Sequence, residues 1–356
     1  MTSMVTLQDQ LDRMTAPGDL VQVVDAAEHK IRCVACGHRC LLKDGRRGIC
    51  KVRYNDGGVL RVPQGYVGAL QIDPIEKKPF FHVTPGAQAL SFGMLGCDFR
   101  CSYCQNWEIS QTLRDEAAGR DYIPISAREL VALGRSRGAR AVASTYNEPL
   151  ITSEWAVEVF KQAREAGLMT LYISNGNGTP EVIEYLTPWL DGYKIDLKTM
   201  NDKHYRRELG GVLQHVLDTI KRVHEAGIWL EVLTLVIPGF NDSSDELWDA
   251  ARYIRGVSPD IPWHVTAFHP DYKMIDPPPT SVDALRRASE IGAEAGLNYV
   301  YAGNLPGRVD PWEDTVCPSC HTPLIRRYGY LIRENKLATT GGVCPQCGTT
   351  IPGIWH

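Results

Sequence analysis

Apolar strand-like segments alternate with amphipathic helical segments through the middle of the chain, and this alternation limits the possible folds most strongly. Six strand–helix units and a final strand follow one another at intervals of roughly 30 residues, as parallel βαβ units require. Such alternation predicts a parallel sheet covered by helices. The predicted strands are 89–95, 139–144, 168–173, 192–197, 228–236, 263–268 and 298–301.

The number of repeats narrows the fold class further. Six units are fewer than the eight that close a TIM barrel, so we expect an open, partial (β/α)6 barrel of α/β class. A flat, doubly wound sheet is the alternative. Both folds place their chemistry beyond the carboxyl ends of the strands. Polar residues gather at those ends, at 146–148, 174–176, 196–198 and 269.

The regions on either side of the barrel carry their own cysteine modules. We expect a leader at 1–88, the barrel at 89–304, and a linker with a second module at 305–356. A net charge of −4 gives no basic surface for nucleic acid or membranes. The first residues show no secretory pattern, and the longest apolar run, 228–237, is too short to span a bilayer, so we expect a cytoplasmic protein.

Eleven cysteines are unusual for a chain of this kind, and they fall into three tight groups. Four lie between Cys33 and Cys50, three between Cys97 and Cys104, and four between Cys317 and Cys347. An odd number argues against a simple disulfide framework. Closely spaced pairs in a protein without a secretory signal predict metal ligands in a reducing compartment.

The middle group has the spacing Cys97-x3-Cys101-x2-Cys104 and follows the first predicted strand. Three thiolates are one short of the four that complete the ligand set of a [4Fe–4S] cluster, so one iron is free for a ligand from outside the protein. A structural zinc site prefers four protein ligands. Simple burial as small apolar residues does not suit three cysteines in a polar loop.

This loop resembles the signature of the radical S-adenosylmethionine (SAM) superfamily. The resemblance implies that the open iron binds the amino and carboxylate groups of SAM, and that an electron from the cluster yields methionine and a 5′-deoxyadenosyl radical. A low-potential flavodoxin or ferredoxin would supply the electron. Tyr103 falls where the family packs against adenine. Residues 89–302 are similar to the activating enzymes of glycyl-radical enzymes, typified by pyruvate formate-lyase activating enzyme.

Further positions match the SAM-binding residues of that family. Asn147 and Glu148 lie in the segment Tyr-Asn-Glu-Pro, where the family has Gly-Gly-Glu-Pro and binds the methionyl amino group. Glu148 is the expected acceptor for that ammonium, and Asn147 replaces a glycine.

Three more residues at later strand ends are expected to contact SAM. Asn175 is a candidate for the ribose or carboxylate, and Lys198 for the carboxylate. His269 matches a histidine near SAM, although a structural histidine is the competing interpretation. Its neighbour in sequence, His264, lies further from the predicted strand end.

The two flanking modules each hold four cysteines. Cys317, Cys320, Cys344 and Cys347 form two C-x2-C pairs separated by 23 residues, which predicts a structural or protein-binding zinc ribbon, with a second iron–sulfur cluster as the alternative. The N-terminal set also has four thiols and favours zinc, with an auxiliary [4Fe–4S] cluster as the alternative and His38 as a spare ligand. Its members are Cys33, Cys36, Cys40 and Cys50.

The whole chain resembles the radical SAM member of the AmmeMemoRadiSam system. The likeness includes the segments 33–55, 75–82, 97–110 and 146–149 and the closing Ile-Pro-Gly-Ile-Trp. It implies Memo-like and AMMECR-like partner proteins but no particular substrate. We therefore expect a radical SAM enzyme acting on a protein, as glycyl-radical activases do. A small-molecule substrate is the first alternative and a non-catalytic zinc adaptor the second.

Overall fold

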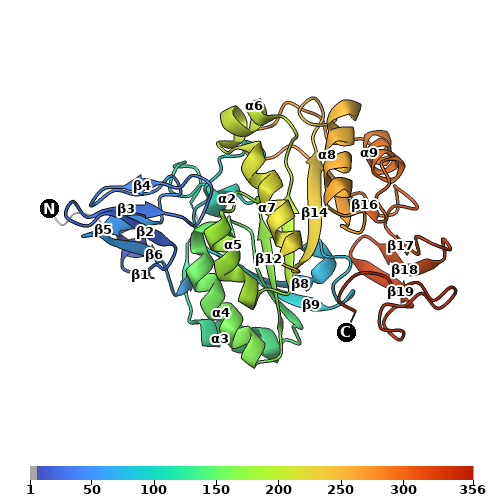
Figure 1. Ribbon diagram of the computed structural model, residues 1–356, viewed down its shortest axis with the longest axis horizontal. Helices are drawn as coiled ribbons and strands as arrows, with labels where there is room; N and C mark the ends of the chain where they lie inside the picture. The colour runs from blue at the N-terminus through green and yellow to red at the C-terminus, as the bar shows by residue number, and fades with distance from the viewer. Residues whose placement is uncertain (1–5, 120, 356) are drawn as a thin grey trace.

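The computed structural model describes residues 6–119 and 121–355. Its centre is an eight-stranded sheet in the order β16-β15-β14-β13-β12-β11-β9-β8 (Figure 1). Seven of these strands are parallel to one another. They are β9 (Gln88–Gly93), β11 (Ala141–Ser144), β12 (Met169–Ser174), β13 (Gly192–Asp196), β14 (Trp229–Val236), β15 (Trp263–Ala267) and β16 (Val300–Gly303).

The parallel strands are arranged in the order of the chain. Parallel strands that are neighbours in the sheet are also consecutive among the seven in the chain, from β9 to β16. A doubly wound sheet requires that the strand order reverse once, so the doubly wound alternative is wrong. Because the strands are parallel and in register, their carboxyl ends lie along one edge, where Ser144 pairs with both Phe92 and Tyr172.

The sheet begins earlier than the sequence suggested. β8 (Ala69–Pro74) lies in the segment that we had assigned to the leader, yet it pairs antiparallel with β9 over its whole length. An antiparallel neighbour needs no helical crossover, so the strand–helix alternation gives no sign of it. A short 3-10 helix, η1 (Ile75–Lys77), follows β8.

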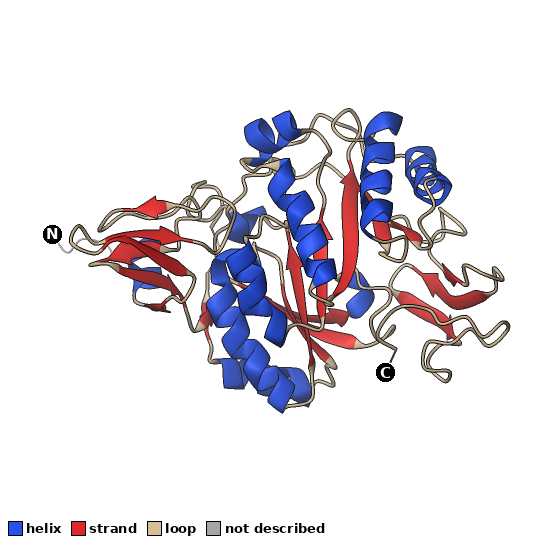
Figure 2. Cartoon of the chain, viewed as in Figure 1, coloured by secondary structure: helices blue, strands red, loops and turns tan. Residues whose placement is uncertain are grey.

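Helices follow the strands and cover one face of the sheet (Figures 1 and 2). They are α3 (Ala127–Ser136), α4 (Ser153–Glu165), α5 (Pro180–Leu186), α7 (Leu213–Glu225), α8 (Ser244–Val257) and α9 (Val282–Glu294). Capping side chains define where they start: Ser126 and Glu129 form a capping box on α3, and Ser243 accepts the Glu246 N–H on α8.

Side chains alternate between the two faces of the strands. Phe92 and Tyr172 pack in the large core that includes the helices. Ala143 and Ile173 point the other way, into a smaller cluster with Phe80. The inner face of the sheet is thus partly filled by the segment that follows β8, and the cavity described below lies on the same face.

Two small modules lie at opposite ends of the molecule (Figure 2). The N-terminal module has α1 (Leu7–Asp12) and two three-stranded sheets. Their strands are β1 (Thr15–Pro17), β2 (Val21–Asp25), β3 (Lys30–Cys33), β4 (Leu41–Leu42), β5 (Tyr54–Asp56) and β6 (Val59–Pro63). The C-terminal module is one antiparallel sheet of β17 (Thr315–Val316), β18 (Pro323–Tyr328) and β19 (Leu331–Asn335).

The C-terminal module is bonded to the segment that follows β8. Arg327 donates to the carbonyl of Phe81 at 2.9 Å, and its guanidinium lies 4.3 Å from the Phe81 ring centre. The His82 Nδ1 atom lies 2.7 Å from the carbonyl of Pro352. These contacts attach the module to the main sheet as one packed unit. Among the described residues, none of the helices has the length and apolar composition needed to cross a bilayer.

Candidate functional site

A cavity of about 390 Å³ opens on the inner face of the sheet near the carboxyl ends of its strands. Its wall includes Cys97, Cys101 and Cys104 together with Tyr103. The structure therefore places the three loop cysteines at the edge where the sequence predicted the chemistry. Other wall residues predicted from the sequence are Asn147, Glu148, Asn175 and Lys198.

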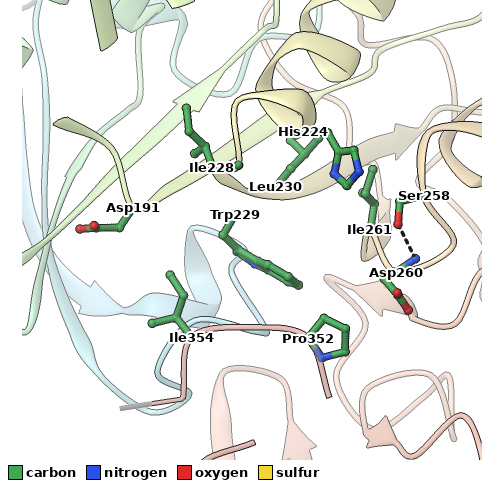
Figure 3. Close-up of a pocket in the computed structure, with 11 residues that line it drawn as sticks. Asp191, His224, Ile228, Trp229, Leu230, Ser258, Asp260, Ile261, Pro352 and Ile354 are labelled. Atoms are coloured by element: carbon green, nitrogen blue, oxygen red, sulfur yellow. Dashed lines mark hydrogen bonds between the residues drawn. The ribbon is translucent and has the colours of Figure 1, made fainter. Parts of the chain in front are cut away.

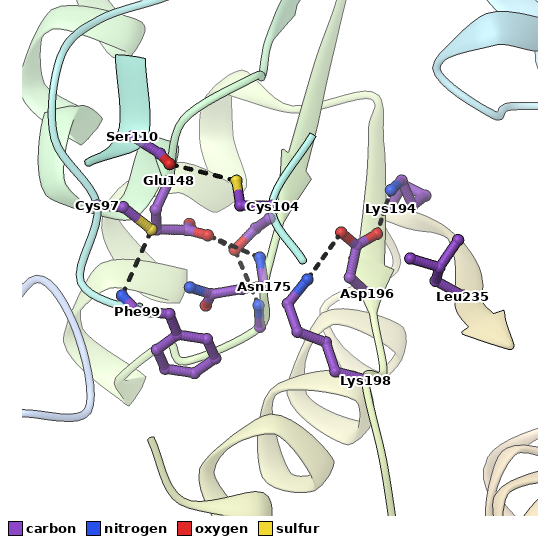
Figure 4. Close-up of polar contacts among 12 residues, drawn as sticks. Cys97, Phe99, Cys104, Ser110, Glu148, Asn175, Lys194, Asp196, Lys198 and Leu235 are labelled. Atoms are coloured by element: carbon purple, nitrogen blue, oxygen red, sulfur yellow. Dashed lines mark hydrogen bonds and ion pairs between the residues drawn. The ribbon is translucent and has the colours of Figure 1, made fainter. Parts of the chain in front are cut away.

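Local bonds hold the cysteine loop in shape (Figure 4). The Phe99 N–H donates to the Cys97 sulfur at 3.4 Å, and the Ser110 hydroxyl lies 3.2 Å from the Cys104 sulfur. Arg114 donates to the carbonyls of Cys97 and Phe99, each at 2.6 Å. These hydrogen bonds hold the backbone of the cysteine loop.

The three thiols suit an iron–sulfur cluster with one open position. Cys101 is buried, and burial raises the pKa of its thiol to about 12. A cluster that binds there must therefore displace a proton, as thiolate ligation generally requires. Soft sulfur donors, a buried setting and an adjoining cavity are the conditions that such a cluster needs.

Glu148 joins the ends of two strands. Its carboxylate accepts the N–H of Asn175 and the hydroxyl of Ser174, both at 2.7 Å, and the N–H of Leu150 at 3.0 Å. Burial, with Asp98 nearby, raises the pKa of Glu148 to about 8. A carboxylate has about four acceptor positions, so these three bonds leave one for an ammonium group in the cavity.

Asn147 lines the cavity, and its side chain also makes two hydrogen bonds to the protein backbone. Its carbonyl oxygen accepts the Met94 N–H at 3.0 Å, and its amide nitrogen donates to the Gly96 carbonyl at 3.1 Å. These bonds connect the segment after β11 to the segment that leads into the cysteine loop. The amide therefore braces the loop, a role that glycine could not perform.

Two residues that sequence reasoning missed lie beside Asn175. The Asp98 carboxylate accepts the side-chain amides of Asn175 and Asn177, each at 2.8 Å. Asp98 is buried and follows the first cluster cysteine directly. Because the side-chain amide of Asn175 donates to Asp98, Asn175 positions the cysteine loop as well as lining the cavity. The Asn-Gly-Asn sequence after β12 was the only signal for Asn177.

A row of charged residues ends β13 (Figure 4). Asp196 pairs with Lys194 on one side and with Lys198 on the other, the latter at 3.3 Å. Burial lowers the pKa of Lys198, but Asp196, Cys101 and neighbouring tyrosines together raise it more, so the net shift is upward and the ammonium stays charged. Lys194 also lines the cavity and was missed, because an isolated lysine inside a strand gives no functional signal.

The aromatic and histidine predictions had different outcomes. Tyr103 is buried, lines the cavity and packs edge-on against Phe240 with ring centres 5.8 Å apart. His269 is exposed and does not line the cavity. Its Nε2 atom lies 3.1 Å from the side-chain amide of Gln105, which does line the cavity. His264 lines the cavity instead, with its Nε2 atom 2.6 Å from the Glu231 carboxylate.

The C-terminal cysteines form a compact group. Their four sulfurs lie within 4.8 Å of one another, and the pairs Cys317–Cys347 and Cys320–Cys344 are 3.6 and 3.7 Å apart. Such a group could hold one metal ion. Of the N-terminal thiols, Cys33, Cys36 and Cys50 are buried and Cys40 is half-buried.

A second hollow of about 430 Å³ lies near the amino end of β14 (Figure 3). Trp229, Pro352 and Ile354 line it, together with His224 and Asp191. None of the described residues that line it is a cysteine. Since parallel α/β folds place their chemistry at the opposite ends of the strands, this hollow is not the candidate active site.

Comparison with known proteins agrees with the geometry. The Radical SAM superfamily model matches residues 93–254, which include all three loop cysteines. The chain is also 38% identical over 326 residues to an uncharacterized protein, MJ0808, of Methanocaldococcus jannaschii, an alignment that covers 91% of this chain and 96% of that protein. The chain belongs to the radical SAM superfamily, whose enzymes use SAM and a [4Fe–4S] cluster.

Activating enzymes are also among its relatives. The chain is 26% identical to the pyruvate formate-lyase-activating enzyme of Clostridium pasteurianum, over 49% of this chain and 71% of the enzyme. It is 22% identical to the pyruvate formate-lyase 1-activating enzyme of Escherichia coli K12, over 61% of this chain and 93% of the enzyme. The predicted similarity to this group is confirmed.

Proposed function

We propose that this chain cleaves SAM reductively and directs the resulting 5′-deoxyadenosyl radical to abstract hydrogen from a protein, as glycyl-radical activases do. The observation that carries the proposal is the cavity wall. Of the three cysteine sets, the incomplete one lines the cavity, beside Glu148 and Lys198. The similarity to two pyruvate formate-lyase activating enzymes supports a protein substrate.

The residues present suit both ends of the methionyl part of SAM. Glu148 retains an acceptor position for an ammonium, and Lys198 offers a charged donor to a carboxylate. Tyr103 provides an apolar ring at the cavity wall for the adenine. When bound, the cluster supplies the electron for SAM cleavage; the protein orients SAM and limits the access of water.

The proposal includes an open partial barrel around this cavity. Sequential strand order and helices on one face are what such a barrel requires. Asn304 and Tyr330 also line the cavity, so the segment after β16 and the β18–β19 turn contribute to its wall beside the edge strand β16.

A small-molecule substrate is the second candidate, because charged side chains extend along the cavity away from the cysteines. Lys78, Lys194 and Glu76 all line it, and Lys78 pairs with Asp73 at 3.0 Å. Such groups could bind a compact anionic metabolite by charge-assisted hydrogen bonds.

Anaerobic reconstitution followed by two radical assays tests the proposal. SAM and dithionite should yield 5′-deoxyadenosine, and adding the protein substrate should yield a protein radical in electron paramagnetic resonance (EPR) spectra. Cys101→Ser should abolish both products, whereas Cys320→Ser, outside the cavity, should leave SAM cleavage intact. Deuterium transfer from a labelled metabolite without any protein radical would favour the small-molecule alternative.

The partners and remaining metals are part of the same proposal. Memo-like and AMMECR-like proteins are the protein partners to test first in the EPR assay, with a flavodoxin or ferredoxin as electron donor, in the cytoplasm. We also propose zinc for the C-terminal set. Zinc–sulfur bonds of about 2.3 Å in a tetrahedron place the sulfurs about 3.8 Å apart, close to the 3.6 and 3.7 Å of the two measured pairs.

A further inference from the structure

The N-terminal cysteines differ from the C-terminal ones in their spacing. The C-terminal set has all four sulfurs within 4.8 Å of one another. Within residues 6–119 and 121–355, no other group of three or more potential ligands is so compact. In the N-terminal set, therefore, no three sulfurs approach one another as zinc ligands do, since a tetrahedral zinc needs sulfurs about 3.8 Å apart.

The N-terminal thiols nevertheless surround a common space. A Cβ atom built on Gly48 would lie 3.6 Å from the Cys40 sulfur and 3.7 Å from the Cys50 sulfur. The Cys33 N–H donates to the carbonyl of Cys40 at 3.0 Å, and Cys36 follows Cys33 by three residues. The four sulfurs are thus grouped, but more widely than around a single ion.

The sulfurs of the catalytic loop are also spaced more widely than the ligands of a single metal ion. Cys97, Cys101 and Cys104 line one cavity, and their three sulfurs do not all lie within 4.8 Å of one another. In a [4Fe–4S] cluster each thiolate binds a different iron, so the sulfurs stand further apart than around one metal ion. By this measure the N-terminal set resembles the cluster site of the same chain and not its zinc-like site.

The segment that carries the N-terminal cysteines is hydrogen-bonded to the catalytic loop and to the residues that support it. The His38 ring lies 3.2 Å from the carbonyl of Asp98, and the Gly37 N–H donates to the Asn177 carbonyl at 2.7 Å. Arg114 donates to the carbonyls of both Ile49 and Cys97, at 2.7 and 2.6 Å. Covalent bonds and one hydrogen-bond contact thus connect Cys36 to Cys97, through His38 and Asp98.

A buried arginine donates a hydrogen bond to one of the N-terminal cysteine sulfurs. Arg53 is 1% exposed and donates through Nε to the Cys33 sulfur at 3.2 Å. Its other nitrogens bind the Glu154 carboxylate at 2.6 and 2.7 Å. A charged donor to a ligand sulfur offsets the negative charge of four thiolates and raises the reduction potential of a cluster.

We propose that Cys33, Cys36, Cys40 and Cys50 bind a second [4Fe–4S] cluster, located behind the catalytic one, in place of the zinc that their sequence pattern favours. All four cluster irons then have protein ligands, so this cluster cannot chelate SAM. The proposal does not depend on the substrate of the radical.

Metal analysis of anaerobically reconstituted protein tests this assignment. We expect about eight irons and about one zinc per chain. In the triple variant Cys97→Ser/Cys101→Ser/Cys104→Ser, about four irons should remain and give the EPR signal of a reduced four-iron cluster, although SAM is no longer cleaved. This variant separates failure of the second cluster from failure of the proposed function.

Two further variants provide matched controls. Cys33→Ser/Cys36→Ser should lose about four irons and keep its zinc, whereas Cys317→Ser/Cys344→Ser should lose zinc and keep its iron. A wild-type protein with about four irons and about two zincs would overturn the proposal, and so would a triple variant without iron. The metal contents of the wild type and the triple variant decide the assignment by themselves, so the test does not depend on whether Cys33→Ser/Cys36→Ser folds.

Discussion

Replacing Asn147 with alanine distinguishes the bracing role found in the structure from the SAM contact that the sequence predicted. The substitution removes the acceptor of the Met94 N–H and the donor to the Gly96 carbonyl, bonds of 3.0 and 3.1 Å. Both backbone groups lie just before Cys97, the first residue of the cysteine loop. Alanine leaves the backbone of residue 147 with ordinary conformational preferences, which glycine would not.

The loss of unfolding free energy in Asn147→Ala follows from the burial of the Met94 N–H and the Gly96 carbonyl. Asn147 is 8% exposed, and Met94 and Gly96 are buried. A buried backbone group left without a partner costs about 1–3 kcal/mol, so two of them cost about 2–6 kcal/mol. Because Asn147 borders the cavity, water can reach part of the site, and we expect about 2–4 kcal/mol.

Urea unfolding of the metal-free protein measures this cost without SAM. In parallel, iron content after reconstitution reports on the catalytic loop, and equilibrium binding reports SAM affinity. We expect lower stability and incomplete loading of the loop. An unchanged unfolding free energy, within about 0.5 kcal/mol, together with full iron and weaker SAM binding would refute the bracing role and restore the predicted contact.

An exposed asparagine supplies the control. Asn298 makes one side-chain hydrogen bond, to Asp260 at 2.7 Å, far in sequence from the cysteine loop. Asn298→Ala should change the unfolding free energy by no more than about 0.5 kcal/mol and leave iron loading intact.

Three other predictions concern charge and metal. Arg53→Met should cost about 3–5 kcal/mol in urea unfolding, because it leaves Glu154 buried and unpaired, and Arg53→Met/Glu154→Leu should recover much of the loss. Burial beside Asp98 raises the pKa of Glu148 from 4.5 to about 8, so its folded carboxyl holds the proton more tightly than its unfolded one. Its contribution to stability is therefore present at low pH and declines as pH rises from 4.5 through about 8, and the unfolding free energy of Glu148→Gln should fall less than that of the wild type over this range. Chelation of the zinc proposed for the C-terminal set should make the C-terminal module sensitive to protease while the main sheet stays folded; a resistant module would show that the module does not need a metal.

Several features of the fold could be predicted from the sequence because they depend on neighbouring residues. The seven parallel strands were expected within a few residues of their observed bounds, since apolar runs and helix periodicity are local. β8 was missed because its antiparallel partner needs no helix between the two strands.

The residues predicted to contact SAM show which features of the site local sequence patterns cannot predict. Glu148 and Lys198 line the cavity as expected, because both follow strand ends along one edge. His269 also follows a strand but is exposed and is not among the residues that line the cavity. Lys194 and His264 lie inside strands, where only the direction of each side chain decides whether it meets the cavity.

By itself the sequence determined how many thiols each site can offer: four, three and four. Ligand number is a property of local spacing, and it predicted that the loop with Cys97, Cys101 and Cys104 is the open site. Only the tertiary structure decided how far apart those thiols stand. The N-terminal and C-terminal sets have the same number of cysteines, yet packing draws one set within 4.8 Å and leaves the other wider. That separation depends on contacts between distant segments, such as Arg53 with Glu154, which no local pattern encodes.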